Sequence, residues 1–183
     1  MEELEMILLE AEDKMDKALS NFERELSTVR TGRANASLLD SIFIEYYGVS
    51  TPLKQVASIT IPEANQLYIK PFDKSICKEI ERAIQASSLG LTPQNDSNGI
   101  RLILPQMTEE RRRELTKVVG KMEEQAKVAV RNIRRDANDE VKKLDLPEDE
   151  EKGTLEEIQQ LTDKKITVIE EIATKKNKDV MSI

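Results

Sequence analysis

The chain has 183 residues, of which 34% are charged and 3% are aromatic, and its formal net charge is −7. Histidine is absent and Cys77 is the single cysteine, which excludes an internal disulfide and a zinc site built from thiolates and imidazoles. The sequence also lacks a glycine-rich phosphate loop, a signal peptide and an apolar run long enough to cross a bilayer, so we expect a cytoplasmic binding protein rather than an enzyme.

Residues 2–30 carry the apolar pattern of an amphipathic helix. No proline or glycine interrupts them, and their apolar residues recur at alternating steps of four and three: Leu4, Leu8, Ala11, Met15, Ala18, Phe22 and Val29, with Leu26 beside the stripe. We predict one long helix. Such a helix cannot bury its stripe alone, so it needs partner helices from elsewhere in the chain.

Residues 31–105 have the pattern of a small unit with strands and one helix. The stretch RTGRANAS contains Gly32 and small polar residues, which predicts a linker. Alternating apolar residues predict strands around 42–46, 58–62, 66–71 and 100–104, and a helix fits 74–88. The stretch NDSNG predicts a turn before the last strand, and Pro105 ends the section.

The remainder of the chain predicts two long helices. One starts after Thr108, a good N-cap, and ends near residue 144, and the next starts at Pro147. Four acids at 148–151 could hold a metal, but they suit a helix N-terminus better. The economical fold is α+β: a three-helix bundle from residues 1–30 and 106–183, with 31–105 inserted as a small β/α/β domain and a hinge at both crossings.

Basic residues gather in the second of the three helices. Residues 107–143 carry 11 basic and 8 acidic groups, whereas 1–30 and 144–183 are net acidic. If Ile133 faces the core, a helix that advances about 100° per residue places six polar residues opposite, with no acid among them: Lys127, Arg131, Arg134, Arg135, Asn138 and Lys142. Guanidinium groups bind phosphate oxygens in pairs, so this stripe predicts a nucleic-acid backbone interface.

Other interpretations stay open at this point. The stripe could be a solvated helix face with Arg131 paired to nearby acids, or it could bind DNA or an acidic protein. The whole chain could be a helical scaffold or an accessory to a nucleic-acid enzyme. The stretch EERRRE at 109–114 either extends the basic surface or pairs with itself. Tyr46 and Tyr47 could stack on bases, although strand alternation should bury one of them, and Cys77 should be a buried apolar residue.

Two long stretches resemble a known family. RTGRANASLLDSIFIEYYGVSTPLKQVASITIPE and TEERRRELTKVVGKMEEQAKVAVRNIRRDAND look like the two signature regions of the bacterial ribosome recycling factors, and the resemblance covers essentially the whole chain. Ala36 stands where many members have proline, which makes the linker less stiff. The resemblance implies an L-shaped protein with a three-helix bundle and an inserted β/α/β domain, without catalytic residues, metal or cofactor.

The resemblance also implies a function and its residues. Such a factor binds the post-termination ribosome and, with elongation factor G and GTP hydrolysis by that partner, promotes splitting into subunits and release of mRNA and tRNA. The contacts of the family to large-subunit rRNA fall on Arg131, Arg134 and Arg135, with Lys127 and Asn138 in the same stripe and three secondary candidates: Arg111, Arg112 and Arg30. The hinge falls on Gly32, Arg33 and Pro105. We expect a monomer with no membrane partner.

Overall fold

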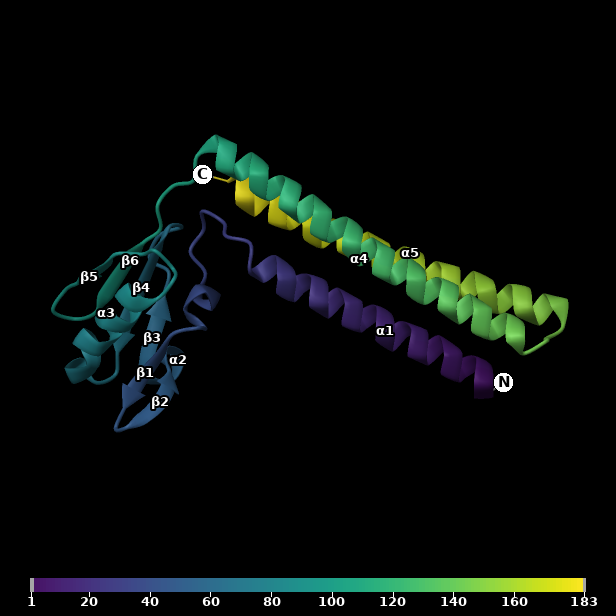
Figure 1. Ribbon diagram of the computed structural model, residues 1–183, viewed down its shortest axis with the longest axis horizontal. Helices are drawn as coiled ribbons and strands as arrows, with labels where there is room; N and C mark the ends of the chain where they lie inside the picture. Colours follow the sequence, from purple (N-terminus) through teal and green to yellow (C-terminus); the bar gives the residue numbers. More distant parts are fainter. Residues whose placement is uncertain (1, 183) are drawn as a thin grey trace. The chain divides into compact units, whose positions relative to one another are not determined.

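The computed structural model describes residues 2–182, and its backbone divides into two compact units (Figure 1). Unit 1 contains residues 2–30 and 110–181. Unit 2 contains residues 31–109 together with Ser182. Unit 1 is therefore assembled from two pieces of chain that unit 2 separates in sequence. Within the described residues, no helix is both long and apolar enough to cross a bilayer.

Unit 1 is a bundle of three long helices. They are α1 (Glu2–Ser27), α4 (Glu109–Lys143) and α5 (Glu148–Met181). In Figure 1, α1 and α5 run in the same direction and α4 runs in the opposite direction. The predicted α+β fold with a three-helix bundle is confirmed, and α1 ends three residues before the predicted 30.

The core of unit 1 follows the predicted stripe of α1 closely. Leu4, Ala11, Met15, Phe22 and Leu26 are buried, while Leu8 and Ala18 are half-buried. At one end of the bundle, side chains from all three helices form a single cluster, in which the buried members are Leu4, Ala11, Ala137, Val141 and Ile158.

The buried line of α5 contains two threonines as well as apolar residues. It runs through Thr154, Ile158, Thr162, Ile169 and Ala173, whereas four other apolar residues of the helix are only half-buried: Leu155, Leu161, Ile166 and Ile172. Threonine can occupy a core because its hydroxyl can bond within its own helix. Thr154 Oγ1 donates to the carbonyl of Glu150 at 3.0 Å, and Thr162 Oγ1 donates to that of Ile158 at 2.8 Å.

The start of α5 explains its four acids. The carbonyl of Pro147 accepts the backbone N–H groups of Glu150 and Glu151, both at 3.0 Å. Residues 148–151 fill the first turn, where negative side chains are stabilised by the positive end of the helix dipole. The predicted role of these acids at a helix N-terminus is confirmed.

Unit 2 begins with a 3-10 turn, Ala36–Leu39, and a hairpin of β1 (Phe43–Tyr46) and β2 (Val49–Pro52). Tyr47 and Gly48 form its two-residue turn with φ of 50° and 76°. Positive φ at both positions is the geometry of a type I′ turn, whose twist matches that of paired strands. The short helix α2 (Leu53–Val56) leads from the hairpin into the main sheet.

The main sheet of unit 2 has four antiparallel strands in the order β3-β4-β6-β5. The strands are β3 (Ala57–Thr60), β4 (Gln66–Pro71), β5 (Pro93–Asn95) and β6 (Ile100–Ile103). A 3-10 turn, Lys74–Ile76, precedes α3 (Cys77–Ala86). Apolar residues from β4, β6 and α3 are fully buried in one core: Leu67, Ile69, Ile80, Ile84, Ile100 and Leu102.

Candidate nucleic-acid interface

The buried residues of α4 define which of its basic residues face outward. These are Leu115, Val119, Ala126, Val130, Ala137 and Val141, whereas Ile133 is only half-buried. At about 100° per residue, Arg135 lies about 160° from the centre of this buried line, Arg131 about 120° and Arg134 about 60°. The three arginines therefore do not form one stripe opposite the core. The prediction of one stripe fails because Ile133, which was taken as the core direction, lies at the edge of the apolar arc and not at its centre.

Arg134 is directed toward α5. Its Nη1 donates to Oε1 of Gln159 at 3.0 Å, and Nε2 of Gln159 donates to Oδ1 of Asp163 at 2.8 Å. The side chain is half-buried. Arg134 thus ties two helices of the bundle together, in addition to anything that it offers to a partner.

Lys127 is also directed toward α5. Its Nζ lies 2.9 Å from Oε1 of Glu170 and 3.1 Å from Oε1 of Glu123, and its side chain is 15% exposed. The hydrogen bond to Glu170 raises the pKa of Lys127, since it stabilises the charged ammonium. Lys127 is therefore matched by two carboxylates, and its predicted place on the outer stripe is wrong.

Arg131 lies on the outer surface, but an acid accompanies it. Nη1 of Arg131 is 3.2 Å from Oε1 of Glu124, two helical turns earlier on the same face. The predicted absence of acids from the stripe is wrong, and the simpler interpretation of a pairing between Arg131 and a nearby acid is confirmed. The arginine side chain remains 40% exposed.

Arg135 and Lys142 fit the predicted outer stripe best. Both are exposed, and neither has a hydrogen-bond or ion-pair partner among residues 2–182. Asn138 is different, because it is half-buried and its Oδ1 is buried without a hydrogen-bond partner in the described part of the chain. Its amide oxygen is therefore unavailable at the surface.

The secondary candidates lie at the other end of α4 and beyond the end of α1. Arg111 pairs with Glu114 at 2.9 Å, so the stretch EERRRE pairs with itself at this position. Arg112 is half-buried, and Arg30 is exposed just after the buried Val29. The predicted hinge residues Gly32 and Arg33 follow the boundary between the units in sequence, and Pro105 follows β6.

The other candidates of unit 2, Tyr46, Tyr47 and Cys77, differ in how far their side chains are exposed. Tyr46 is half-buried against the core, while Tyr47 is 84% exposed at the hairpin turn, and their rings meet edge to face with centroids 4.5 Å apart. Cys77 is half-buried rather than buried. Desolvation by burial raises the pKa of the Cys77 thiol, so the thiol is a poor nucleophile.

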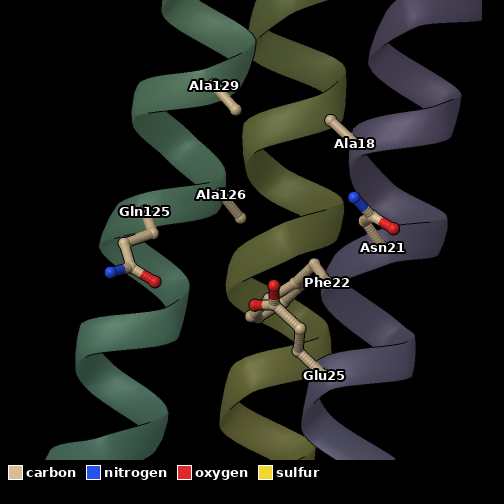
Figure 2. A pocket seen from close by; sticks show the side chains of 7 residues that line it. All are labelled: Ala18, Asn21, Phe22, Glu25, Gln125, Ala126 and Ala129. Atoms are coloured by element: carbon tan, nitrogen blue, oxygen red, sulfur yellow. The ribbon is translucent and has the colours of Figure 1, made fainter.

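Sequence reasoning missed a groove in the bundle, which Figure 2 shows from close by. It has a volume of about 160 Å³ and is lined by residues of α1 and α4: Ala18, Asn21, Phe22, Glu25, Gln125, Ala126 and Ala129. In this view α5 runs between the other two helices. Alanines on both walls leave the space open, so small residues at facing positions of the two helices are the sequence feature that could have predicted the groove.

Among residues 2–182 there is no group of three or more histidine, cysteine, aspartate or glutamate side chains that could hold a metal ion.

Comparisons of the sequence and of the structure with known proteins agree on one family. A family model described as Ribosome recycling factor matches residues 22–181. Proteins named ribosome-recycling factor from Acholeplasma laidlawii and Bacillus subtilis are 58% and 51% identical. The alignments cover 100% and 97% of this chain, respectively, and 99% and 98% of the two relatives.

Solved structures agree with the sequence relatives. A solution structure of the ribosome recycling factor superposes with a TM-score of 0.82 at 43% identity and covers 100% of both chains. A second structure, with a TM-score of 0.68, 40% identity and coverage of 98% of this chain and 99% of the other, is titled as models for the T. thermophilus ribosome recycling factor and the E. coli elongation factor G bound to the E. coli post-termination complex. The chain described here belongs to the ribosome recycling factor family.

Proposed function

We propose that this protein recycles ribosomes after translation termination. It binds the post-termination ribosome in the cytoplasm and, with elongation factor G and GTP, promotes splitting into subunits and release of mRNA and tRNA. The observation that carries this function is the similarity over the whole chain to proteins named ribosome-recycling factor. The protein acts by binding and is not an enzyme, so the GTPase partner supplies the work.

The outer face of α4 is the proposed contact to large-subunit rRNA. Arg135 is the leading residue, since an exposed guanidinium without an internal partner can bind a phosphate at no cost to the fold. Arg131 contributes after exchanging Glu124 for a phosphate. Lys127 and Arg134 act mainly by holding α4 against α5, and Asn138 is too buried to be a leading contact. Arg30, Arg111 and Arg112 remain secondary contacts.

Splitting of the ribosome is the test of this function. Post-termination ribosomes are mixed with elongation factor G, GTP and either the native protein or Arg135→Ala, and light scattering follows the loss of intact ribosomes. Arg82→Ala is a matched control, because Arg82 is an exposed arginine of α3. We expect the native protein and the control to split ribosomes and Arg135→Ala to do so poorly.

The outcomes separate the role from its residues. Equal splitting by all three proteins would keep the recycling role and remove Arg135 from the interface. No splitting by the native protein, with a matched elongation factor present, would overturn the role itself. A helical scaffold would then be the better interpretation, and its partner binding should be insensitive to salt, whereas binding to several phosphates weakens steeply with salt.

A hinge at Gly32, Arg33 and Pro105 is part of the same proposal. The chain passes from unit 1 to unit 2 just before Gly32 and returns to unit 1 after Pro105, at residues 109–110. The free protein is proposed to be a monomer whose units reorient. Spin labels on Cys introduced at Lys121 and Arg82, in a Cys77→Ala background, would report the distance between units. A broad distribution that narrows on the ribosome supports the hinge, and one narrow, unchanged distribution contradicts it.

A further inference from the structure

The solvent face of the four-stranded sheet in unit 2 has an unusual set of side chains. Strand alternation and register place Tyr68 at its centre, with Thr60 opposite it on β3 and Arg101 opposite it on β6. Gln66 and Lys70 flank Tyr68 along β4, and Gln94 lies opposite Arg101 on β5. All six are exposed or half-exposed. We call this surface the Tyr68 face.

The ring of Tyr68 is held in place from two sides. Its hydroxyl donates to Oδ1 of Asp96 at 3.2 Å, and that carboxylate also accepts the backbone N–H groups of Asn98 and Gly99, both at 2.8 Å. The guanidinium carbon of Arg101 lies 5.8 Å from the ring centroid. A ring fixed in this way loses little conformational entropy when a ligand stacks on it.

Arg101 is oriented as well. Its Nη1 donates to Oε1 of Gln66 at 3.3 Å, and Nε2 of Gln66 donates to Oε2 of Glu63 at 3.1 Å. The chain therefore holds an aromatic ring and a cation next to each other through two short hydrogen-bond chains, each of which ends on a carboxylate in a loop.

The strand residues of the Tyr68 face carry a net positive charge. Arg101 and Lys70 point from its strands, and none of the strand residues that share this face is acidic. Glu63 and Asp96 lie in loops at its rim, and both are engaged with Gln66 and Tyr68. Lys70 has no hydrogen-bond or ion-pair partner among residues 2–182. Its ammonium group is therefore available to an anionic ligand.

We propose that the Tyr68 face binds single-stranded RNA, with a base stacked on Tyr68 and the flanking phosphates bound by Arg101 and Lys70. A sheet that presents an aromatic ring between cations is a general solution for unpaired bases, because every base has a π-face and its phosphates carry the charge. Paired bases in a duplex do not offer that face. The proposal goes beyond ribosome recycling and does not rest on it.

A protein partner fits this surface less well. Protein interfaces are built around buried apolar and aromatic anchors. On the Tyr68 face the only exposed large aliphatic residue within the described chain is Ile103, which is 41% exposed. The remaining side chains are polar, so an anionic and aromatic ligand matches them better than an apolar one.

Nuclear magnetic resonance of the full chain tests the proposal, because it separates the sheet from the basic face of α4. The 15N-labelled protein is titrated with the RNA octamer (rU)8 at low salt. We expect saturable shifts of the amides of residues 66–70 and 100–103. Uracil protons should move upfield through the ring current of Tyr68, and this movement should disappear in Tyr68→Leu.

Variants make the outcome decisive. Tyr68→Leu should weaken binding at the sheet at least tenfold, while Phe43→Leu, which removes an exposed aromatic of β1, should leave it unchanged. Lys70→Gln should weaken it and flatten its salt dependence, whereas Lys74→Gln should do neither. Shifts confined to α4, equal binding by Tyr68→Leu and native protein, or equal sheet shifts with octaglutamate would each overturn the proposal. None of these outcomes depends on ribosome splitting.

Discussion

Arg134 and Arg135 are neighbours in sequence, but they meet different surroundings. Arg134 donates to Gln159 of α5 at 3.0 Å, whereas Arg135 is exposed without a partner among residues 2–182. One step along a helix turns a side chain by about 100°, which is enough to separate a bundle contact from an outer surface. Adjacent arginines in one motif can therefore have different roles.

This difference predicts opposite profiles for two alanine variants. Arg134→Ala removes a hydrogen bond between helices and should lower the free energy of unfolding by about 1 kcal/mol. Arg135→Ala should change it by less than about 0.5 kcal/mol, as exposed substitutions usually do. Urea unfolding followed by circular dichroism measures both. Equal losses of stability in the two variants would contradict the assigned geometry.

The ion pair of Arg131 predicts a gain of binding. Glu124→Gln removes the carboxylate that holds the guanidinium, so ribosome binding at low salt should strengthen by about twofold, since an exposed pair is worth about 0.5 kcal/mol. Ribosome pelleting over a range of salt concentrations measures this. Glu157→Gln, the same charge change at an exposed position of α5, is the control. An equal gain in both variants would mean that net charge alone is responsible.

Phe22 predicts the largest loss of stability in unit 1. It is 2% exposed and lies beside the groove between α1 and α4, so truncation would enlarge an existing space (Figure 2). Phe22→Ala should lower the free energy of unfolding by about 3–5 kcal/mol. Met6→Ala, at a 60% exposed position of the same helix, should cost less than about 0.5 kcal/mol. Thermal unfolding followed by the helical signal measures both variants. A loss of stability in Phe22→Ala as small as that in Met6→Ala would contradict the packing argument.

The turn before β6 predicts a dependence of stability on pH. Hydrogen bonds from the backbone N–H groups of Asn98 and Gly99 hold the pKa of Asp96 below its ordinary value. The carboxylate therefore stabilises unit 2 fully above the unfolded pKa, near 4, and loses this contribution as the pH falls through the lower folded pKa.

The comparison with Asp96→Asn tests that sign. The native protein should be more stable than Asp96→Asn between pH 5 and 7, by a constant difference, and the difference should shrink below about pH 4. Thermal unfolding, followed by the NMR signals of unit 2 at each pH, measures the two proteins side by side. A difference that grows on acidification would show that the charged form of Asp96 is not the stabilising one.

The long helices were predictable because their signals are local. The apolar stripe of α1 and the acids after Pro147 each depend on neighbours within a few residues. The strand β5 was missed because its sequence, Pro93–Asn95, has no apolar alternation, and its pairing with β6 is a tertiary effect. The hairpin strand β2 was missed for a similar reason, since its residues are largely polar or exposed.

The candidate interface was predictable only in part. The sequence located the basic residues on α4, but their directions depend on which side of the apolar arc faces α5. Lys127 pairs with Glu170 and Arg134 donates to Gln159, both on α5. The sequence of α4 alone does not predict partners on another helix. Arg135 was placed correctly because it lies far from the core direction under either choice of centre.

The division of unit 1 into two pieces of chain has a consequence for synthesis. α1 is synthesised before unit 2, and α5, which packs against α1, is synthesised after it. At a synthesis rate of about 5–20 residues per second, α5 follows α1 after a delay on the order of 10 s. During this delay the apolar stripe of α1 is not covered by α5. Unit 2 is complete well before that moment. The nascent chain therefore carries a folded small unit and an uncovered helix together, and α1 is the segment that a chaperone would meet.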